Sequence, residues 1–196
     1  EPPQLPSGSF GKNAYLRLGF EPGPHRTLLR TLHRRAPLIV QQALYWDEEM
    51  PGLPCVSIIS NAGGILQGDR NVIEIDLQAG AQAHVTTQSA TRIHEMDANY
   101  ASQTQLLTLG PGSYLEYIPR PIIPHKNSRF IQTTKIEVDP SATLIYSEIM
   151  MPGRKYYRDG EIFEYELFSS TVTTHRPSGQ SRFTVKLLIR PKLDKL

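Results

Sequence analysis

Residues 73–83 read Ile-Glu-Ile-Asp-Leu-Gln-Ala-Gly-Ala-Gln-Ala, and this stretch decides the fold. Its first half alternates the apolar residues Ile73, Ile75 and Leu77 with acidic ones. Successive side chains of a β-strand point to opposite faces, so the alternation predicts a strand with one buried face. The Ala-Gly pair that follows is typical of a tight turn, because glycine tolerates positive φ. The stretch therefore predicts a strand, a sharp turn and the start of a second strand.

A similar phrase returns twice further along the chain, at residues 109–115 and 138–144. Stacked strand-turn-strand units bury a shared core layer by layer. We therefore predict an all-β protein, an irregular β-helix-like stack of short strands, with a closed barrel as the alternative. The sequence shows no strict repeat of fixed length, so a regular solenoid is not indicated. One or two short helices are expected, at residues 26–34 and after Gln88, where Ser89 is a candidate cap.

Three more runs show the same period of two, and they predict further half-buried strands. They are Leu16 to Phe20, Phe163 to Leu167 and Phe183 to Ile189. Residues 1–12 are rich in Pro, Gly and Ser and are expected to form a flexible lead-in. We expect residues 13–196 to form a single all-β domain that is truncated at its C-terminal end.

Charge and cysteine content narrow the class of protein. The 196 residues include 21 Lys and Arg against 19 Asp and Glu, a formal net charge of +2, which gives no electrostatic case for nucleic acid or a membrane surface. No apolar stretch approaches the ~20 residues that a membrane helix needs. The basic cluster of Arg30, His33, Arg34 and Arg35 is either a solvated face or a contact surface. Cys55 stands alone in an apolar run, which fits a buried, inert thiol and a reducing compartment.

A search for catalytic or metal-binding patterns finds little. The six histidines form no HxH, HxxxH or HExxH pattern, and no CxxC is present. His84 and His94 are either metal ligands that meet in space or ordinary hydrogen-bonded histidines. The segment 63–70, Gly-Gly-Ile-Leu-Gln-Gly-Asp-Arg, lacks the Walker and dinucleotide signatures, so the residue types favour a glycine-rich turn.

Two carboxylates stand within apolar strands, Glu116 in residues 114–118 and Glu148 in residues 144–149. Burying an unpaired charge is costly, so each side chain either faces water or lines a polar interior. A hydrated interior lined by carboxylates suits a passing divalent cation, which binds oxygen ligands and water readily.

Four ordered motifs resemble the urease accessory proteins called D or H. The resemblance runs from about Gly11 to about Arg190, and the order and spacing of the motifs match as well. The motifs are Gly63-Gly64-Ile65-Leu66-Gln67-Gly68-Asp69-Arg70, Ala83-His84-Val85-Thr86-Thr87-Gln88-Ser89-Ala90-Thr91, Tyr114-Leu115-Glu116-Tyr117-Ile118-Pro119 and Met151-Pro152-Gly153-Arg154. Residues 119–125 depart from the family in being richer in proline, which puts the geometry of that loop in doubt.

The resemblance implies an all-β, helix-like stack without catalytic activity of its own. A member of this family is expected to act in the cytoplasm as a chaperone-like scaffold of metalloenzyme maturation. Its partners would be apo-urease and the F accessory protein, which recruits the G protein, a GTPase that carries nickel. No stably bound cofactor is expected; nickel would be cargo in transit through the interior.

Residue by residue, the resemblance and the carboxylate argument give one set of candidates. For nickel passage they are Asp69, Glu116 and Glu148. Gly63, Gly64 and Gly68 are expected to shape the turn, and Thr87, Gln88 and Arg154 match family motifs. Two rival hypotheses are a polysaccharide-acting β-solenoid enzyme and a plain β-sandwich interaction module without a metal path.

Overall fold

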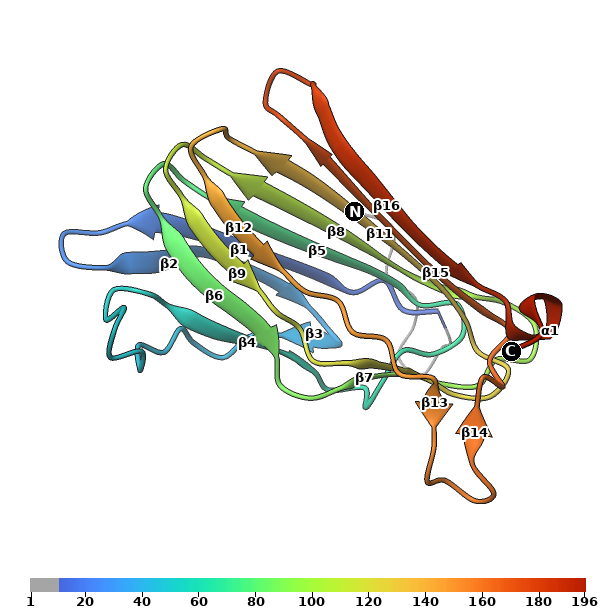
Figure 1. The fold of residues 1–196 in the computed structure, drawn as a ribbon. Helices are drawn as coiled ribbons and strands as arrows, with labels where there is room; N and C mark the ends of the chain where they lie inside the picture. The colour runs from blue at the N-terminus through green and yellow to red at the C-terminus, as the bar shows by residue number, and fades with distance from the viewer. Residues whose placement is uncertain (1–10) are drawn as a thin grey trace.

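The computed structural model describes residues 11–196, and Figure 1 shows that the regular structure of these residues is almost entirely β-strand. The only helix in this range is α1 (Pro191–Asp194). The all-β prediction is confirmed. The lead-in expected at residues 1–12 falls almost wholly outside the described residues, although the backbone N–H of Lys12 donates to Asp69.

One large sheet forms a face of the molecule. Its strand order is β16-β15-β11-β8-β5-β1-β2, and the four central contacts between β15 and β1 are all parallel. The outermost pairs, β1 with β2 and β15 with β16, are antiparallel. In chain order the strands are β1 (Tyr15–Pro22), β2 (Thr27–Arg35), β5 (Arg70–Leu77), β8 (Ala101–Leu109), β11 (Arg129–Val138), β15 (Leu167–His175) and β16 (Ser181–Ile189).

A second sheet lies opposite the first, with the strand order β12-β9-β6-β4-β3. Its members are β3 (Leu38–Ile39), β4 (Cys55–Ser60), β6 (Gln82–Thr87), β9 (Tyr114–Tyr117) and β12 (Thr143–Tyr146). Two small pairs complete the fold: β7 (Thr91–Ile93) with β10 (Ile122–Pro124), and the hairpin of β13 (Gly153–Arg154) with β14 (Glu161–Ile162).

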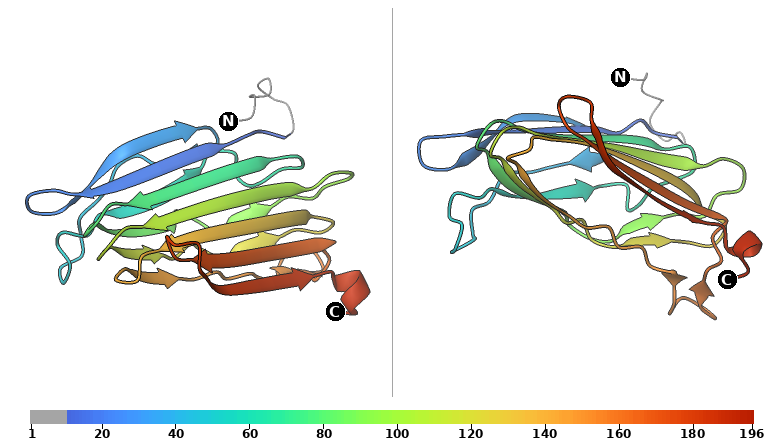
Figure 2. Two further views of the ribbon diagram at one scale, coloured as in Figure 1. Left: turned by 90° about the horizontal axis from the view of Figure 1, so that it is seen from above. Right: turned by 45° about the horizontal axis from the view of Figure 1, so that its top comes forward.

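The recurring phrases are the turns that carry the chain from one sheet to the other. They join β5 to β6, β8 to β9 and β11 to β12, and the three passes lie on one another in parallel register (Figure 2). In the large sheet Arg70 is level with Ser102, Ser102 with Ile131, and Ile131 with Ser169. The number of residues between paired positions therefore differs from one turn of the stack to the next. The loops that connect the strands account for this difference, while the strands stay in register.

The fourth pass departs from this pattern. After β15 the chain turns back as β16 instead of crossing to the second sheet, so within residues 11–196 no strand extends that sheet beyond β12. The inner side of β15 and β16 thus lines an apolar groove of about 530 Å³. Phe183 and Val185 of β16 are half exposed there, whereas the alternation had predicted a half-buried strand.

Three local predictions were wrong. Residues 26–34 do not form a helix; most of them belong to β2, which pairs with β1 and packs Leu29 and Leu32 against the core. The stretch after Gln88 bends and becomes β7, and it is not helical. Residues 163–166 form no strand, since Phe163 has a positive φ of 57° that breaks the extended backbone. In each case strand pairing or a turn overrode the local pattern.

The apolar core has two parts. The larger part joins both sheets and contains the predicted face of Leu16, Leu18 and Phe20, each fully buried. The smaller part surrounds Phe130 and Phe168 near the other end of the strands. Polar side chains that also point inward separate the two parts.

Candidate functional site

Six inward-facing polar side chains form what we call the polar band: Asn71, Gln103, Gln105, Gln132, Thr134 and Ser170. Strand register explains how they meet: Asn71 is level with Gln103, Gln103 with Gln132, and Gln132 with Ser170. On each strand these polar residues share a face with buried apolar residues of the core. The polar band therefore runs across the inner face of the large sheet. The Gln103 amide donates to the Gln132 carbonyl oxygen at 3.3 Å.

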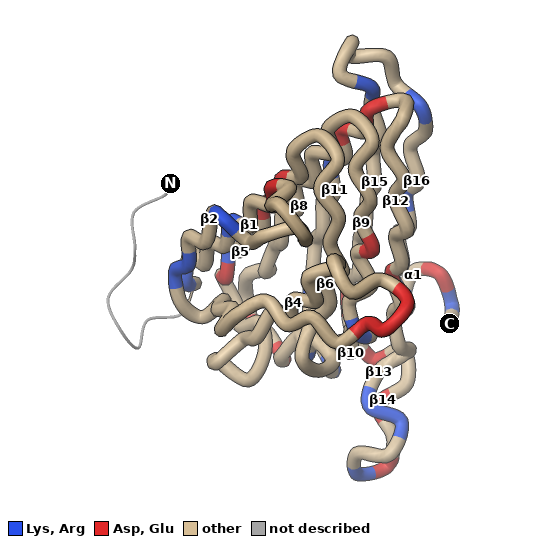
Figure 3. The backbone as a smooth tube through the Cα atoms, turned by 90° about the vertical axis from the view of Figure 1, so that its left-hand side faces the viewer, with Lys and Arg blue, Asp and Glu red and all other residues tan. Residues whose placement is uncertain are grey.

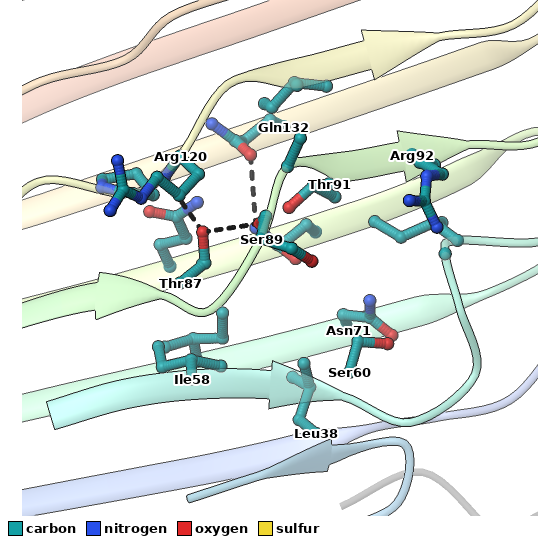
Figure 4. Close-up of a pocket in the computed structure, with 18 of the residues that line it drawn as sticks. Leu38, Ile58, Ser60, Asn71, Thr87, Ser89, Thr91, Arg92, Arg120 and Gln132 are labelled. Carbon is teal, nitrogen blue, oxygen red and sulfur yellow. Dashed lines mark hydrogen bonds between the residues drawn. The ribbon is translucent and has the colours of Figure 1, made fainter.

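A cavity of about 220 Å³ lies between the two sheets at the polar band, and the carbonyl oxygens of Asn71 and Gln105 are buried at it. Neither oxygen has a hydrogen-bond partner among the described residues. Figure 4 shows Thr87, Ser89, Arg92 and Arg120 around the same cavity. Buried polar atoms of native proteins are normally satisfied by protein, water or ions. This cavity is therefore polar enough to hold water or a hydrated ion.

Glu148 is the carboxylate at the end of the polar band. Its Oε2 accepts hydrogen bonds from the Tyr146 hydroxyl at 2.9 Å and from the Ser170 hydroxyl at 3.1 Å. The same residue lines both the polar cavity and the apolar groove beside β16. Glu148 thus stands where the interior cavity meets the groove at the open side of the fold.

Glu116 occupies a different place from Glu148. Its neighbours Leu115 and Tyr117 are buried in the core, so Glu116 points to the outer face of the second sheet. There it accepts a hydrogen bond from the Tyr114 hydroxyl and lies 2.7 Å from His84 Nδ1. These hydrogen bonds, that from Tyr114 first, lower the pKa of Glu116 below its ordinary value. The sequence could have predicted the outward orientation of Glu116, because Glu116 stands between two large apolar residues and neighbouring side chains of a strand point to opposite faces.

Cys55 of β4 lies level with His84 of β6, which in turn lies level with Glu116 of β9. Cysteine, histidine and glutamate thus form a row across three neighbouring strands. The thiol is buried, as predicted, and burial raises its pKa. A raised pKa keeps sulfur in the unreactive thiol form. This row therefore gives no support to a cysteine nucleophile.

Asp69 is almost fully buried, but it lies in a turn and does not line the cavity. Its carboxylate accepts the backbone N–H groups of Lys12 and Leu66 at 2.9 and 2.8 Å. Asp69 thus holds the turn before β5 closed against Lys12, which precedes β1. The structure does not bring Asp69, Glu116 and Glu148 together, and among residues 11–196 no group of three or more His, Cys, Asp or Glu side chains gathers in a metal-binding arrangement.

The glycine-rich segment forms a turn. Gly63 and Gly68 have positive φ values of 72° and 81°. At Gly64 a Cβ atom would lie 2.5 Å from His94 Nε2 and 2.8 Å from the backbone oxygen of Arg92, so the lack of a side chain admits the His94 ring. Gly63 and Gly64 also line the polar cavity.

The remaining motif residues have separate structural contacts. Thr87 lines the cavity, and its hydroxyl accepts the backbone N–H of Arg120 at 2.9 Å and donates to the Ser89 carbonyl at 3.1 Å. Gln88 is exposed. Arg154 forms two hydrogen bonds with the buried carboxylate of Glu161, a partner that the sequence motif did not reveal.

His84 and His94 do not meet. His94 instead packs its ring edge-on against His125, with ring centroids 5.0 Å apart. His125 is 5% exposed. Burial, followed by the positive charge of Arg154, lowers the pKa of His125 to about 4.

This lowered pKa predicts acid sensitivity. An unfolded histidine takes up a proton near pH 6.5, whereas folded His125 does so near pH 4, so the unfolded state binds more protons between these values. The His125 contribution to stability is therefore complete above about pH 6.5 and is lost as the pH falls toward 4, by about 3 kcal/mol. Urea unfolding of the wild type and of His125→Gln from pH 7 to 4.5 measures it. We expect the wild type to lose more stability than the variant; parallel curves would contradict the assignment.

Comparison with known protein families agrees with the sequence motifs. The family model of the UreD urease accessory protein matches residues 12–195, nearly the whole chain. The chain belongs to the UreD family. The family assignment proposed from the four motifs is therefore confirmed.

Individual relatives support the same assignment. The chain is 71% identical over 191 residues to urease accessory protein UreD 2 of Brucella ovis, covering 97% of this chain and 63% of the relative. It is 52% identical to UreD of Yersinia enterocolitica and 51% identical to UreD of Yersinia pseudotuberculosis, covering all of this chain and 62% and 61% of those proteins. The chain thus spans a little over three fifths of these UreD proteins. No helix within residues 11–196 has the length and apolar character to cross a membrane.

Proposed function

We propose that this chain is a non-catalytic scaffold of urease maturation. It holds apo-urease together with the F and G accessory proteins in the cytoplasm, and nickel passes through its interior on the way to the urease active site. Membership of the UreD family supports the role in maturation. The observation that supports the passage of nickel is the position of Glu148 between the polar cavity and the groove.

The chemistry of the interior suits a hydrated cation. Amide and hydroxyl oxygens line the polar band, and the unpaired oxygens of Asn71 and Gln105 are available to water around an ion. Oxygen donors and water suit divalent cations that must be released again, whereas thiolates hold metals such as zinc tightly. Nickel would therefore move from the cavity past Glu148 into the groove. We assign Asp69 to the turn and Glu116 to the outer face, so neither is needed along this path.

The test is a urease maturation assay that measures nickel per urease molecule. Glu148→Leu removes the charge and is expected to lower nickel content severalfold, and Glu148→Gln to lower it less. Glu137→Gln is the matched control, because Glu137 is an exposed carboxylate on the large sheet. Each variant must still co-purify with its partners. Full nickel content with Glu148→Leu would refute the passage and leave a plain interaction module; failure of the wild type to bind any maturation protein would refute the scaffold role.

A further inference from the structure

The β13–β14 hairpin projects from the body of the protein, with charged residues at its end (Figures 1 and 3). We call Lys155–Arg158 the hairpin tip. Beneath it, Nε and Nη2 of Arg154 donate hydrogen bonds to Glu161, and Glu161 also accepts the backbone N–H of Lys126 at 3.3 Å. Backbone hydrogen bonds from Tyr157 N–H to Arg154 and from Gly160 N–H to Tyr157 order the turn itself. The tip is therefore an exposed element on a rigid base.

The tip exposes an aromatic ring almost completely to solvent. Tyr156 is 91% exposed, more than any other large apolar or aromatic side chain described. Tyr157 is held in place differently, since Arg154 lies 3.7 Å and Arg158 5.1 Å from its ring centre. Tyrosine and arginine are enriched among the residues that dominate protein interfaces. A tyrosine on a pre-ordered turn also loses little conformational entropy on binding.

The charges of the tip indicate what it fits. Within residues 11–196 neither Lys155 nor Arg158 forms an ion pair with a carboxylate; both cations lie instead over tyrosine rings. Asp159 follows Arg158 in the turn, so residues 155–159 carry two cations and one carboxylate. The two cations beside Tyr156 match an acidic protein surface. They are too few for nucleic acid, where binding relies on many phosphate contacts. Ile162 at 45% and Met151 at 40% exposure border the hairpin and add apolar contact area.

We propose that the hairpin tip is a docking element for a protein partner that offers a negatively charged surface with a recess for the Tyr156 ring. This inference rests on the proposed scaffold function and deepens it by naming the surface through which one maturation protein is held. Tyr156 supplies the buried contact area, and Lys155 and Arg158 supply orientation and a faster encounter.

Binding assays with purified apo-urease and, separately, with the F accessory protein test the proposal. The variants are Tyr156→Ala and the double variant Lys155→Glu/Arg158→Glu. We expect each to weaken binding to one of the two probes by about tenfold or more, the loss typical of an interface hot spot. The wild-type affinity should fall with added salt more steeply than that of the double variant. Tyr100→Ala and Lys135→Glu are matched controls on other exposed surfaces, and circular dichroism should show all variants folded.

The outcomes separate the two proposals. If the wild type binds either probe and the tip variants bind both as tightly, the docking element is refuted while the scaffold function stands. If the wild type binds neither probe, both are refuted. If the tip variants lose binding to single-stranded DNA or anionic vesicles but keep both proteins, the docking element is also refuted.

Discussion

Replacing Phe130 with alanine is expected to lower the free energy of unfolding by about 4 kcal/mol, as large-to-small changes in rigid cores do. Phe130 is fully buried in the smaller part of the core, and its ring centre lies 6.1 Å from that of Phe168. Removing the ring loses apolar burial and leaves a cavity that the surrounding strands are not free to fill, because the ladders on both sides of β11 fix its position.

Urea unfolding followed by circular dichroism measures this loss. Phe130→Leu is the matched control, since it keeps most of the volume and should cost less than about 1.5 kcal/mol. A loss below about 1 kcal/mol for Phe130→Ala would show that the site collapses, contrary to expectation.

Arg154→Ala is expected to lower the free energy of unfolding by about 3 kcal/mol, because removing one partner of a buried ion pair strands the other charge. Glu161 is 8% exposed, and both of its carboxylate oxygens accept hydrogen bonds from Arg154. Burial alone would raise the pKa of Glu161, but the Arg154 hydrogen bonds hold it below its ordinary value. Without Arg154, the one hydrogen bond left to the Glu161 carboxylate within residues 11–196 comes from the Lys126 backbone N–H.

The double variant Arg154→Met/Glu161→Met distinguishes two causes of instability, the loss of the ion pair and the burial of an unpaired Glu161 carboxylate. Two apolar side chains leave no buried charge, so this variant should be clearly more stable than Arg154→Ala. Arg154→Lys should fall between wild type and alanine, because a lysine cannot offer two parallel hydrogen bonds. Equal instability of the double and single variants would contradict this explanation.

In β1 and β5 the period of two in the sequence correctly predicted which residues face the core. Leu16, Leu18 and Phe20 are buried as expected, and so are Ile73, Ile75 and Leu77. The recurring turn phrases also indicated the parallel stacking. The helix expected at residues 26–34 was wrong because pairing with β1, a tertiary contact, determines the backbone there. β16 is exposed despite its apolar pattern because it lies at the edge of the large sheet, where no strand of the second sheet within residues 11–196 covers it.

The candidate site was only partly predictable. Glu148 was singled out from its apolar surroundings, and it does face the interior. The polar band was missed because its members come from four strands far apart in the chain, and sequence alone does not give the register between them. A usable signal was present: Asn71 shares its strand face with Ile73, and Gln132 shares one with Phe130. Polar residues at inward positions of several strands indicate a polar layer.

The polar band divides the apolar interior between two clusters that do not merge. Each cluster is thus in a position to act as its own cooperative folding unit, with amide hydrogen exchange near Phe130 and Phe168 proceeding through an opening that leaves Leu18 and Ile75 protected. Such a division would let one end of the molecule loosen while the other end keeps the strand register intact.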